Sequence, residues 1–172
     1  MSLTKQLAEF AVDLRASPLP DDVRRAAERA VLDWLGSAIR GGEVFPARAA
    51  LAVARQAMAG QEATVLATGE RLSALGAAFA NGAASHVLEL DDLHQASTFH
   101  PAAPIISAAL AAAERADASG QGFVRAVVAG YEVGIRLAEA VNPSHYRYWH
   151  PTATCGVFGA TAAAGTVLGL SC

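Results

Sequence analysis

Apolar residues recur along most of this chain at the spacing of one face of a helix. From Leu7 to Leu14 they fall at i, i+3, i+4 and i+7, with charged residues around the rest of the helical wheel. Prolines, paired glycines and short polar segments interrupt the pattern, as they do where helices begin and end. The pattern predicts seven helices, near residues 5–17, 20–40, 46–59, 74–90, 105–116, 121–141 and 151–170.

Particular residues indicate where these helices start and stop. A proline and two aspartates at 20–22 suit a helix N-terminus, and Gly41 and Gly42 are expected to end that helix because glycine tolerates positive φ. Ser73 is a candidate N-cap. Residues 63–73 break the helical period and predict one short, irregular hairpin. The expected fold class is therefore all-α, a helical bundle-like domain.

Composition bounds the kind of protein. The chain has 172 residues, enough for one domain, with 53% hydrophobic and 17% charged residues. This apolar balance predicts helices buried on several sides inside something larger. The formal net charge is -3 and Lys and Arg are scattered, which argues against a nucleic-acid partner.

The termini and cysteines indicate a compartment. Charges are spread through the first fifteen residues, so no signal peptide and no secretion are expected. Cys155 and Cys172 form no CxxC pair, which favours neither a disulfide framework nor a zinc site and fits the cytoplasm. Residues 152–170 carry no charge over a bilayer-spanning length, but they are mostly Ala, Gly and Thr. We expect a buried helix there and no membrane span.

The stretch 81–101, NGAASHVLELDDLHQASTFHP, concentrates titratable groups in a chain that is otherwise poor in charge. Burying such groups is costly, and histidine titrates near neutral pH, so their crowding indicates a site where protons move. The stretch contains three acids and three histidines, namely Glu89, Asp91, Asp92, His86, His94 and His100.

A second polar loop, residues 144–151, ends in the same His-Pro dipeptide as the first. His100 and His150 each come directly before a helix rich in small residues. If these helix starts converge, their free N–H groups would favour a bound carboxylate. The two histidines would then be placed to act as acid or base on that ligand.

Five segments of the chain together resemble the MmgE/PrpD family, which includes 2-methylcitrate dehydratases, cis-aconitate decarboxylases and iminodisuccinate epimerases. The resemblance covers most of the chain. It rests on RAVLDWLGSAIRG, AAFANGAASHVLELDDLH, HPAAPIISAALAAAE, GYEVGIRL and WHPTATCGVFGATAAAGTVLGLS.

That resemblance implies the first part of a helical domain. The family's later lysine and its separate lid domain would lie outside this chain, so the 172 residues alone are expected to be inactive. It also implies a homodimer, a small di- or tricarboxylate substrate, and no required metal or organic cofactor. The implied reaction is dehydration, decarboxylation or epimerisation through proton removal next to a carboxylate, or its equivalent at a decarboxylating carbon.

The resemblance also assigns roles to residues. Two positions depart from the family pattern, because Glu89 stands where Asp is usual and Leu93 stands where Thr is usual. The implied catalytic residues are Asp91, His100 and His150. The implied substrate-binding residues are Glu89, Asp92, His94 and Thr152.

Other interpretations of the same residues stay open. Asp91 or Asp92 can be explained as a helix cap or loop support, and His86, within a helical run, as a structural histidine. Two alternative functions also fit the sequence. One is a non-enzymatic helical interaction module or half of a split protein. The other is a metal-binding helical protein whose divalent ion is held by Asp91, Asp92, His94, His100 and His150.

Overall fold

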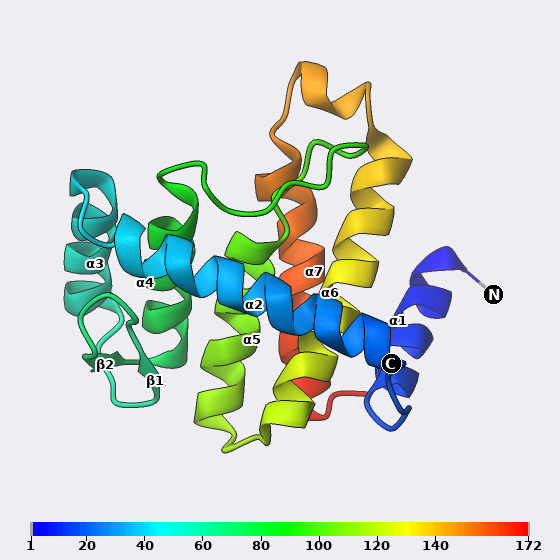
Figure 1. Cartoon of the computed structure of the whole chain (residues 1–172), viewed down its shortest axis with the longest axis horizontal. Coiled ribbons are helices and arrows are strands. Elements are labelled where there is room, and N and C mark those ends of the chain that lie inside the picture. The colour runs from blue at the N-terminus through cyan, green and yellow to red at the C-terminus, as the bar shows by residue number, and fades with distance from the viewer. Residues whose placement is uncertain (1, 172) are drawn as a thin grey trace.

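The computed structural model describes residues 2–171, which form seven α-helices, a short 3-10 turn and one two-stranded sheet (Figure 1). This confirms the all-α prediction and the single hairpin, whose strands pair antiparallel with Ala63 opposite Leu72. The elements are α1 (Leu3–Leu14), α2 (Asp21–Gly41), α3 (Phe45–Ala57), β1 (Ala63–Thr64), β2 (Arg71–Leu72), α4 (Ala74–His86), α5 (Ala102–Arg115), α6 (Gly120–Val141), η1 (His145–Arg147) and α7 (Pro151–Leu168).

Helix α5 is the centre of the fold. It packs against α4, α6 and α7, while α2 lies across α4, α5 and α6 (Figure 1). Ile105 and Ile106 of α5 are fully buried and share one core with Trp34 of α2 and Val127 of α6. Phe99, in the loop before α5, is buried in the same core. The loop that carries the titratable groups is thus anchored to the best-packed part of the domain.

Small residues let α6 and α7 cross with their backbones in contact. A Cβ atom on Gly159 would lie 2.6 Å from Ile105 Cδ1 and 2.8 Å from the carbonyl oxygen of Gly130. The uncharged C-terminal helix is thus buried along the face that meets α5 and α6, whereas Val157 and Phe158 on its other side are exposed. Among residues 2–171, no helix combines the length and apolar character needed to cross a bilayer.

Several predicted helix ends differ from the structure. Helix α4 stops at His86 rather than near residue 90, and α5 starts at Ala102 rather than at residue 105. Gly42 has a right-handed φ of -62°, so positive φ is not the reason for the glycine pair. Gly41 instead allows close approach, because a Cβ there would collide with the Ala84 carbonyl of α4. Cys172 lies outside the described residues.

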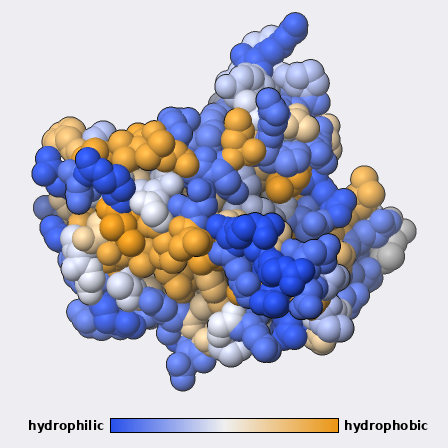
Figure 2. All heavy atoms as spheres, in the orientation of Figure 1, coloured by the Kyte–Doolittle hydropathy of each residue, from blue (hydrophilic) through white to orange (hydrophobic). Residues whose placement is uncertain are grey.

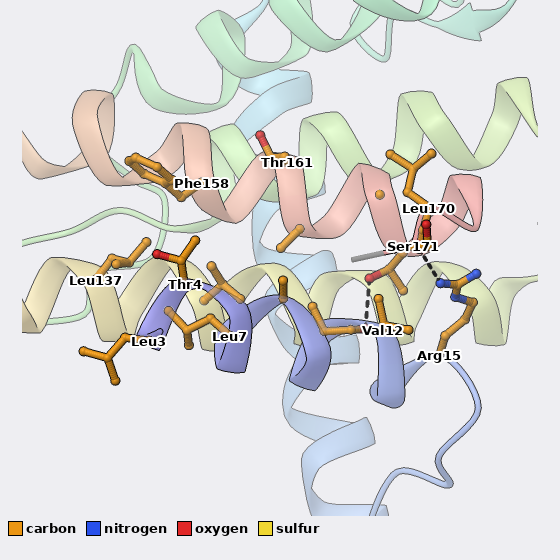
Figure 3. Close-up of a pocket in the computed structure, with 16 residues that line it drawn as sticks. Leu3, Thr4, Leu7, Val12, Arg15, Leu137, Phe158, Thr161, Leu170 and Ser171 are labelled. Atoms are coloured by element: carbon orange, nitrogen blue, oxygen red, sulfur yellow. Dashed lines mark hydrogen bonds between the residues drawn. The ribbon is translucent and has the colours of Figure 1, made fainter. Parts of the chain in front are cut away.

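An apolar groove of about 390 Å³ runs between α1, α6 and α7 (Figure 3). Leu7, Leu137 and Phe158 line it from the three helices, and Arg15 Nη2 closes one end by donating to the Leu170 carbonyl at 2.7 Å. Of the described residues, none from the stretch 81–101 lines this groove. It is therefore separate from the candidate site.

The surface of the domain is uneven in polarity. In Figure 2, hydrophilic residues cover the N-terminal half of α2, and apolar residues gather to its left, over the region of α2, α3 and α4. Large apolar side chains exposed on α2 and α3 include Leu32, Ile39 and Phe45. Apolar surface of this extent is typical of a face that contacts further protein.

Candidate active site

The two histidine-containing loops meet at one end of the domain. The loop between α4 and α5 and the loop between α6 and α7 both lie at the top of Figure 1. The backbone N–H of His100 donates to the Thr152 hydroxyl at 3.1 Å, which ties the start of α5 to the start of α7. The two helix N-termini named in the sequence analysis therefore do lie together.

Asp91 is the centre of the titratable cluster. Its side chain is completely buried, and two histidines face it. His86 Nδ1 lies 3.1 Å from Asp91 Oδ2, within hydrogen-bond distance. His100 Nδ1 lies 3.5 Å from Asp91 Oδ1, a charge contact longer than an ordinary hydrogen bond. A buried carboxylate between two imidazoles can orient both rings and stabilise either of them when protonated.

His150 joins this cluster through His86. The Nε2 atoms of the two rings are 3.4 Å apart. The hydrogen bond that His86 donates to Asp91, reinforced by the charge of Asp91, raises the pKa of His86 above its usual value. Burial, followed by the neighbouring charges of His86 and His100, lowers the pKa of His150. The two rings therefore differ in proton affinity although they are in contact, which is typical of an acid–base site.

Asp92 points to the opposite side of the loop. Its Oδ1 accepts the backbone N–H of Ala102 at 3.0 Å, and its Oδ2 accepts the Tyr131 hydroxyl at 2.8 Å. Burial raises the pKa of Asp92, and it also raises the pKa of Tyr131, which therefore stays protonated and donates. Asp92 thus caps α5, so the first free N–H of that helix is already occupied. Helix α7 has no side-chain cap.

We expect Tyr131→Phe to destabilise the protein by about 1–3 kcal/mol, because the substitution leaves a buried oxygen of Asp92 without its donor. Denaturant unfolding monitored by circular dichroism measures this change. Tyr148→Phe is the matched control, since Tyr148 is 80% exposed and the same loss of a hydroxyl should change little there. Equal stabilities of Tyr131→Phe and the wild type would contradict the structural role of Asp92.

The other predicted substrate-binding residues lie at different depths. Glu89 adopts a left-handed φ of 53°, and its carboxylate is 3.7 Å from His86 Nε2 and 3.8 Å from His100 Nε2. Thr152 is buried beside His100. His94 is farther along the loop, where its Nδ1 contacts the Ser97 hydroxyl at 2.8 Å. Substrate binding by these residues stays a prediction.

Comparison with known proteins places the chain in a family. The model of the MmgE/PrpD N-terminal domain matches residues 5–172. The chain belongs to the MmgE/PrpD family. It is 31% identical over 180 residues to a cis-aconitate decarboxylase-like protein of Aspergillus oryzae, covering 99% of this chain and 37% of that protein. This confirms the resemblance seen in the sequence.

Further relatives carry a similar name. A cis-aconitate decarboxylase of Aspergillus terreus is 27% identical over 176 residues, with 98% of this chain and 36% of the relative covered. The human cis-aconitate decarboxylase is 31% identical over 178 residues, with 99% and 37% covered. The chain thus spans a little more than a third of the length of these MmgE/PrpD relatives.

His86 is a member of the candidate site that is absent from the site residues predicted from the sequence. The sequence suggests a structural histidine within a helix; in the structure it is the last residue of α4 and faces both Asp91 and His150. A signal was present in the sequence. A histidine at the C-terminal end of a helix, directly before an acidic loop, is placed to turn back onto that loop.

The metal alternative draws on a different set of residues from the one expected. In the described part of the chain, donor atoms of His86, Asp91 and His100 lie within 4.8 Å of one another. Asp92, His94 and His150 are not in that group, and Asp92 is committed to Ala102 and Tyr131. The contacts within the group are those of an imidazole–carboxylate hydrogen bond and a neighbouring imidazole.

Proposed function

We propose that the whole protein containing this sequence is a lyase that acts on a small di- or tricarboxylate by moving a proton next to a carboxylate. The observation that carries the proposal is the buried Asp91 carboxylate with His86, His100 and His150 beside it, at the joint start of α5 and α7. The names of the relatives support a substrate of the cis-aconitate type.

Decarboxylation is the reaction that we propose first. The bond from carbon to one carboxylate breaks, carbon dioxide leaves, and the electron pair stays on the remaining carbon skeleton. A proton from an acid then completes the product, so one proton is consumed for each molecule of carbon dioxide. His100 and His150 are the proposed acid–base residues, and Asp91 orients them and offsets their charge.

Binding of the substrate carboxylates follows from the same geometry. Protonated imidazoles and the uncapped N-terminus of α7 favour anionic groups, whereas the start of α5 is occupied by Asp92. We propose that Glu89, His94 and Thr152 contact the substrate, as the family resemblance implies. No step of this scheme needs a metal or an organic cofactor.

We further propose that the whole protein is a cytoplasmic homodimer, as the family resemblance implies. The exposed apolar side chains of α2 and α3 support a protein contact on this domain. Dehydration of 2-methylcitrate would use the same groups in the other direction, since it removes a proton next to a carboxylate whereas decarboxylation adds one to the carbon skeleton. It is the second reaction to assay if cis-aconitate is not turned over.

We expect His100→Ala and His150→Ala each to lower kcat by about 10²–10⁴-fold in the whole protein, the usual contribution of a positioned acid or base. Carbon dioxide release from cis-aconitate measures turnover, and circular dichroism checks that both variants fold. His94→Ala, outside the Asp91 cluster, should change KM more than kcat. Unchanged kcat in both His100 and His150 variants would remove these residues from the mechanism.

A further inference from the structure

His86 has contacts that the proposed roles of His100 and His150 do not explain. Its Nδ1 lies 3.1 Å from Asp91 Oδ2, and its Nε2 lies 3.4 Å from His150 Nε2. One imidazole therefore joins a buried carboxylate to a second imidazole through its two ring nitrogens. Its side chain is only 25% exposed.

The rings of His86 and His150 meet edge to edge. Their centroids are 5.7 Å apart and their planes differ by 16°. The centroid separation exceeds the Nε2–Nε2 separation of 3.4 Å by two imidazole ring radii, so both nitrogens lie close to the line between the ring centres. An N–H on an imidazole points outward along that line. A proton between the two nitrogens would thus make a nearly straight hydrogen bond.

Asp91 determines which nitrogen of His86 carries a proton. An ionised carboxylate only accepts hydrogen bonds, so Nδ1 of His86 is protonated. A neutral His86 then accepts at Nε2 from His150, and a charged His86 donates from Nε2 to His150. In both states one proton lies between the two Nε2 atoms, and Nδ1 of His150 is the nitrogen left for a substrate.

We propose that His86 is a positioning residue that shares this proton with His150 and couples His150 to Asp91. When His150 gives its Nδ1 proton to a substrate, the shared proton moves from His86 Nε2 to His150 Nε2, and His86 becomes neutral. Proton uptake at Nδ1 runs the same steps in reverse. Over a release step and an uptake step together, one proton leaves the pair and one proton enters it. The substrate in this scheme rests on the proposed function, whereas the shared proton is a property of the protein alone.

The charges around the pair favour this arrangement. Asp91, first through its hydrogen bond, raises the pKa of His86, while burial and then the charge of His86 lower the pKa of His150. Glu89 and His100 are the other ionisable groups that face the pair from the loop and the start of α5. These two directions favour the positive charge on His86, next to Asp91, over His150.

The turn before His150 and helix α7 add few charges to this environment. His145 contacts the Thr154 hydroxyl at 2.6 Å, and Arg147 is exposed in the same turn. Residues 151–168 of α7 include no Asp, Glu, Lys, Arg or His. Contact with the His86 ring is therefore the main influence on the pKa of His150 that a single substitution can remove selectively.

Two amide variants separate proton sharing from simple support of Asp91. His86→Asn places an amide nitrogen where Nδ1 stands and keeps a donor to Asp91. His86→Gln places its amide near Nε2 and keeps a partner for His150. Neither amide titrates, so neither can pass a proton.

The experiment follows the titration of His150 by NMR in the whole protein with labelled histidine, together with the pH profile of kcat. In both variants we expect the pKa of His150 to rise towards its usual value of 6.5, because the neighbouring positive charge is gone. We also expect kcat to fall at least about tenfold, less than on loss of an acid or base itself. His145→Asn, the matched control, should leave the His150 titration unchanged.

The outcomes distinguish this inference from the proposed function. An unchanged His150 titration together with wild-type kcat in His86→Asn would show that His86 only supports Asp91, and would overturn the inference. If neither the wild type nor any variant turns over the substrate, the proposed function fails, and the His150 titration still tests whether His86 and His150 are coupled. If His86→Asn does not fold, His86→Gln gives the same two readouts.

Discussion

Asp91→Asn in the whole protein is expected to lower kcat for cis-aconitate by about 10²–10⁴-fold while the protein stays folded. Asparagine keeps the shape of the side chain but removes the charge that faces His86 Nδ1 at 3.1 Å and His100 Nδ1 at 3.5 Å. Without that charge, protonation of His86 is no longer favoured. The rings of His86 and His100 also lose the carboxylate that both of them face. Steady-state turnover and a thermal melt of the same sample measure the two parts of this expectation.

Asp92→Asn is the matched control for this result. The two aspartates are adjacent in sequence, but Asp92 accepts hydrogen bonds from Ala102 and Tyr131 instead of facing the histidines. Its replacement should act mainly on stability, with a smaller effect on kcat than Asp91→Asn. A larger loss of kcat in Asp92→Asn than in Asp91→Asn would reverse our assignment of the two carboxylates.

Gly159→Ala is expected to destabilise the domain by about 1–3 kcal/mol, the usual cost of overpacking a core. The added Cβ would lie 2.6 Å from Ile105 Cδ1 and 2.8 Å from the Gly130 carbonyl oxygen. The carbonyl belongs to the backbone of α6, so α6 and α7 would have to move apart. Denaturant unfolding of the variant measures the cost.

Gly36→Ala is the opposite case and serves as the control. Gly36 lies inside α2, and a Cβ there would have no neighbouring atom within 4 Å. Alanine in an open helical position should stabilise the protein by about 0.5–1 kcal/mol. If Gly159→Ala were as stable as Gly36→Ala, the close crossing of α6 and α7 would be wrong.

Most helices were predictable from sequence because their apolar residues recur with a helical period, whereas α4 and α7 are rich in small residues and begin directly after Ser73 and His150. Their ends were less predictable where tertiary contacts decide them. Gly41 was expected to end a helix through positive φ, but it is explained by the approach of Ala84 from another helix. Such a contact joins residues 43 positions apart and leaves no local signal in the sequence.

The candidate site was predictable in its location but not in its internal arrangement. The stretch 81–101 and His150 do meet, yet the irregular loop has no period that would show which side Asp91 or Asp92 faces. That choice depends on Tyr131, which is 39 residues from Asp92 along the chain. The contact of His86 with His150 spans 64 residues and depends on the packing of α4, α5 and α7.

Turnover of cis-aconitate by the whole protein in deuterated water tests the central claim most directly. If Asp91 and the histidines around it deliver the proton that completes the product, the wild type releases carbon dioxide and the product contains one solvent deuterium. His150→Ala and Asp91→Asn should lose both signals together. Carbon dioxide release at wild-type rate by these two variants would contradict the claim that this cluster is the acid–base site.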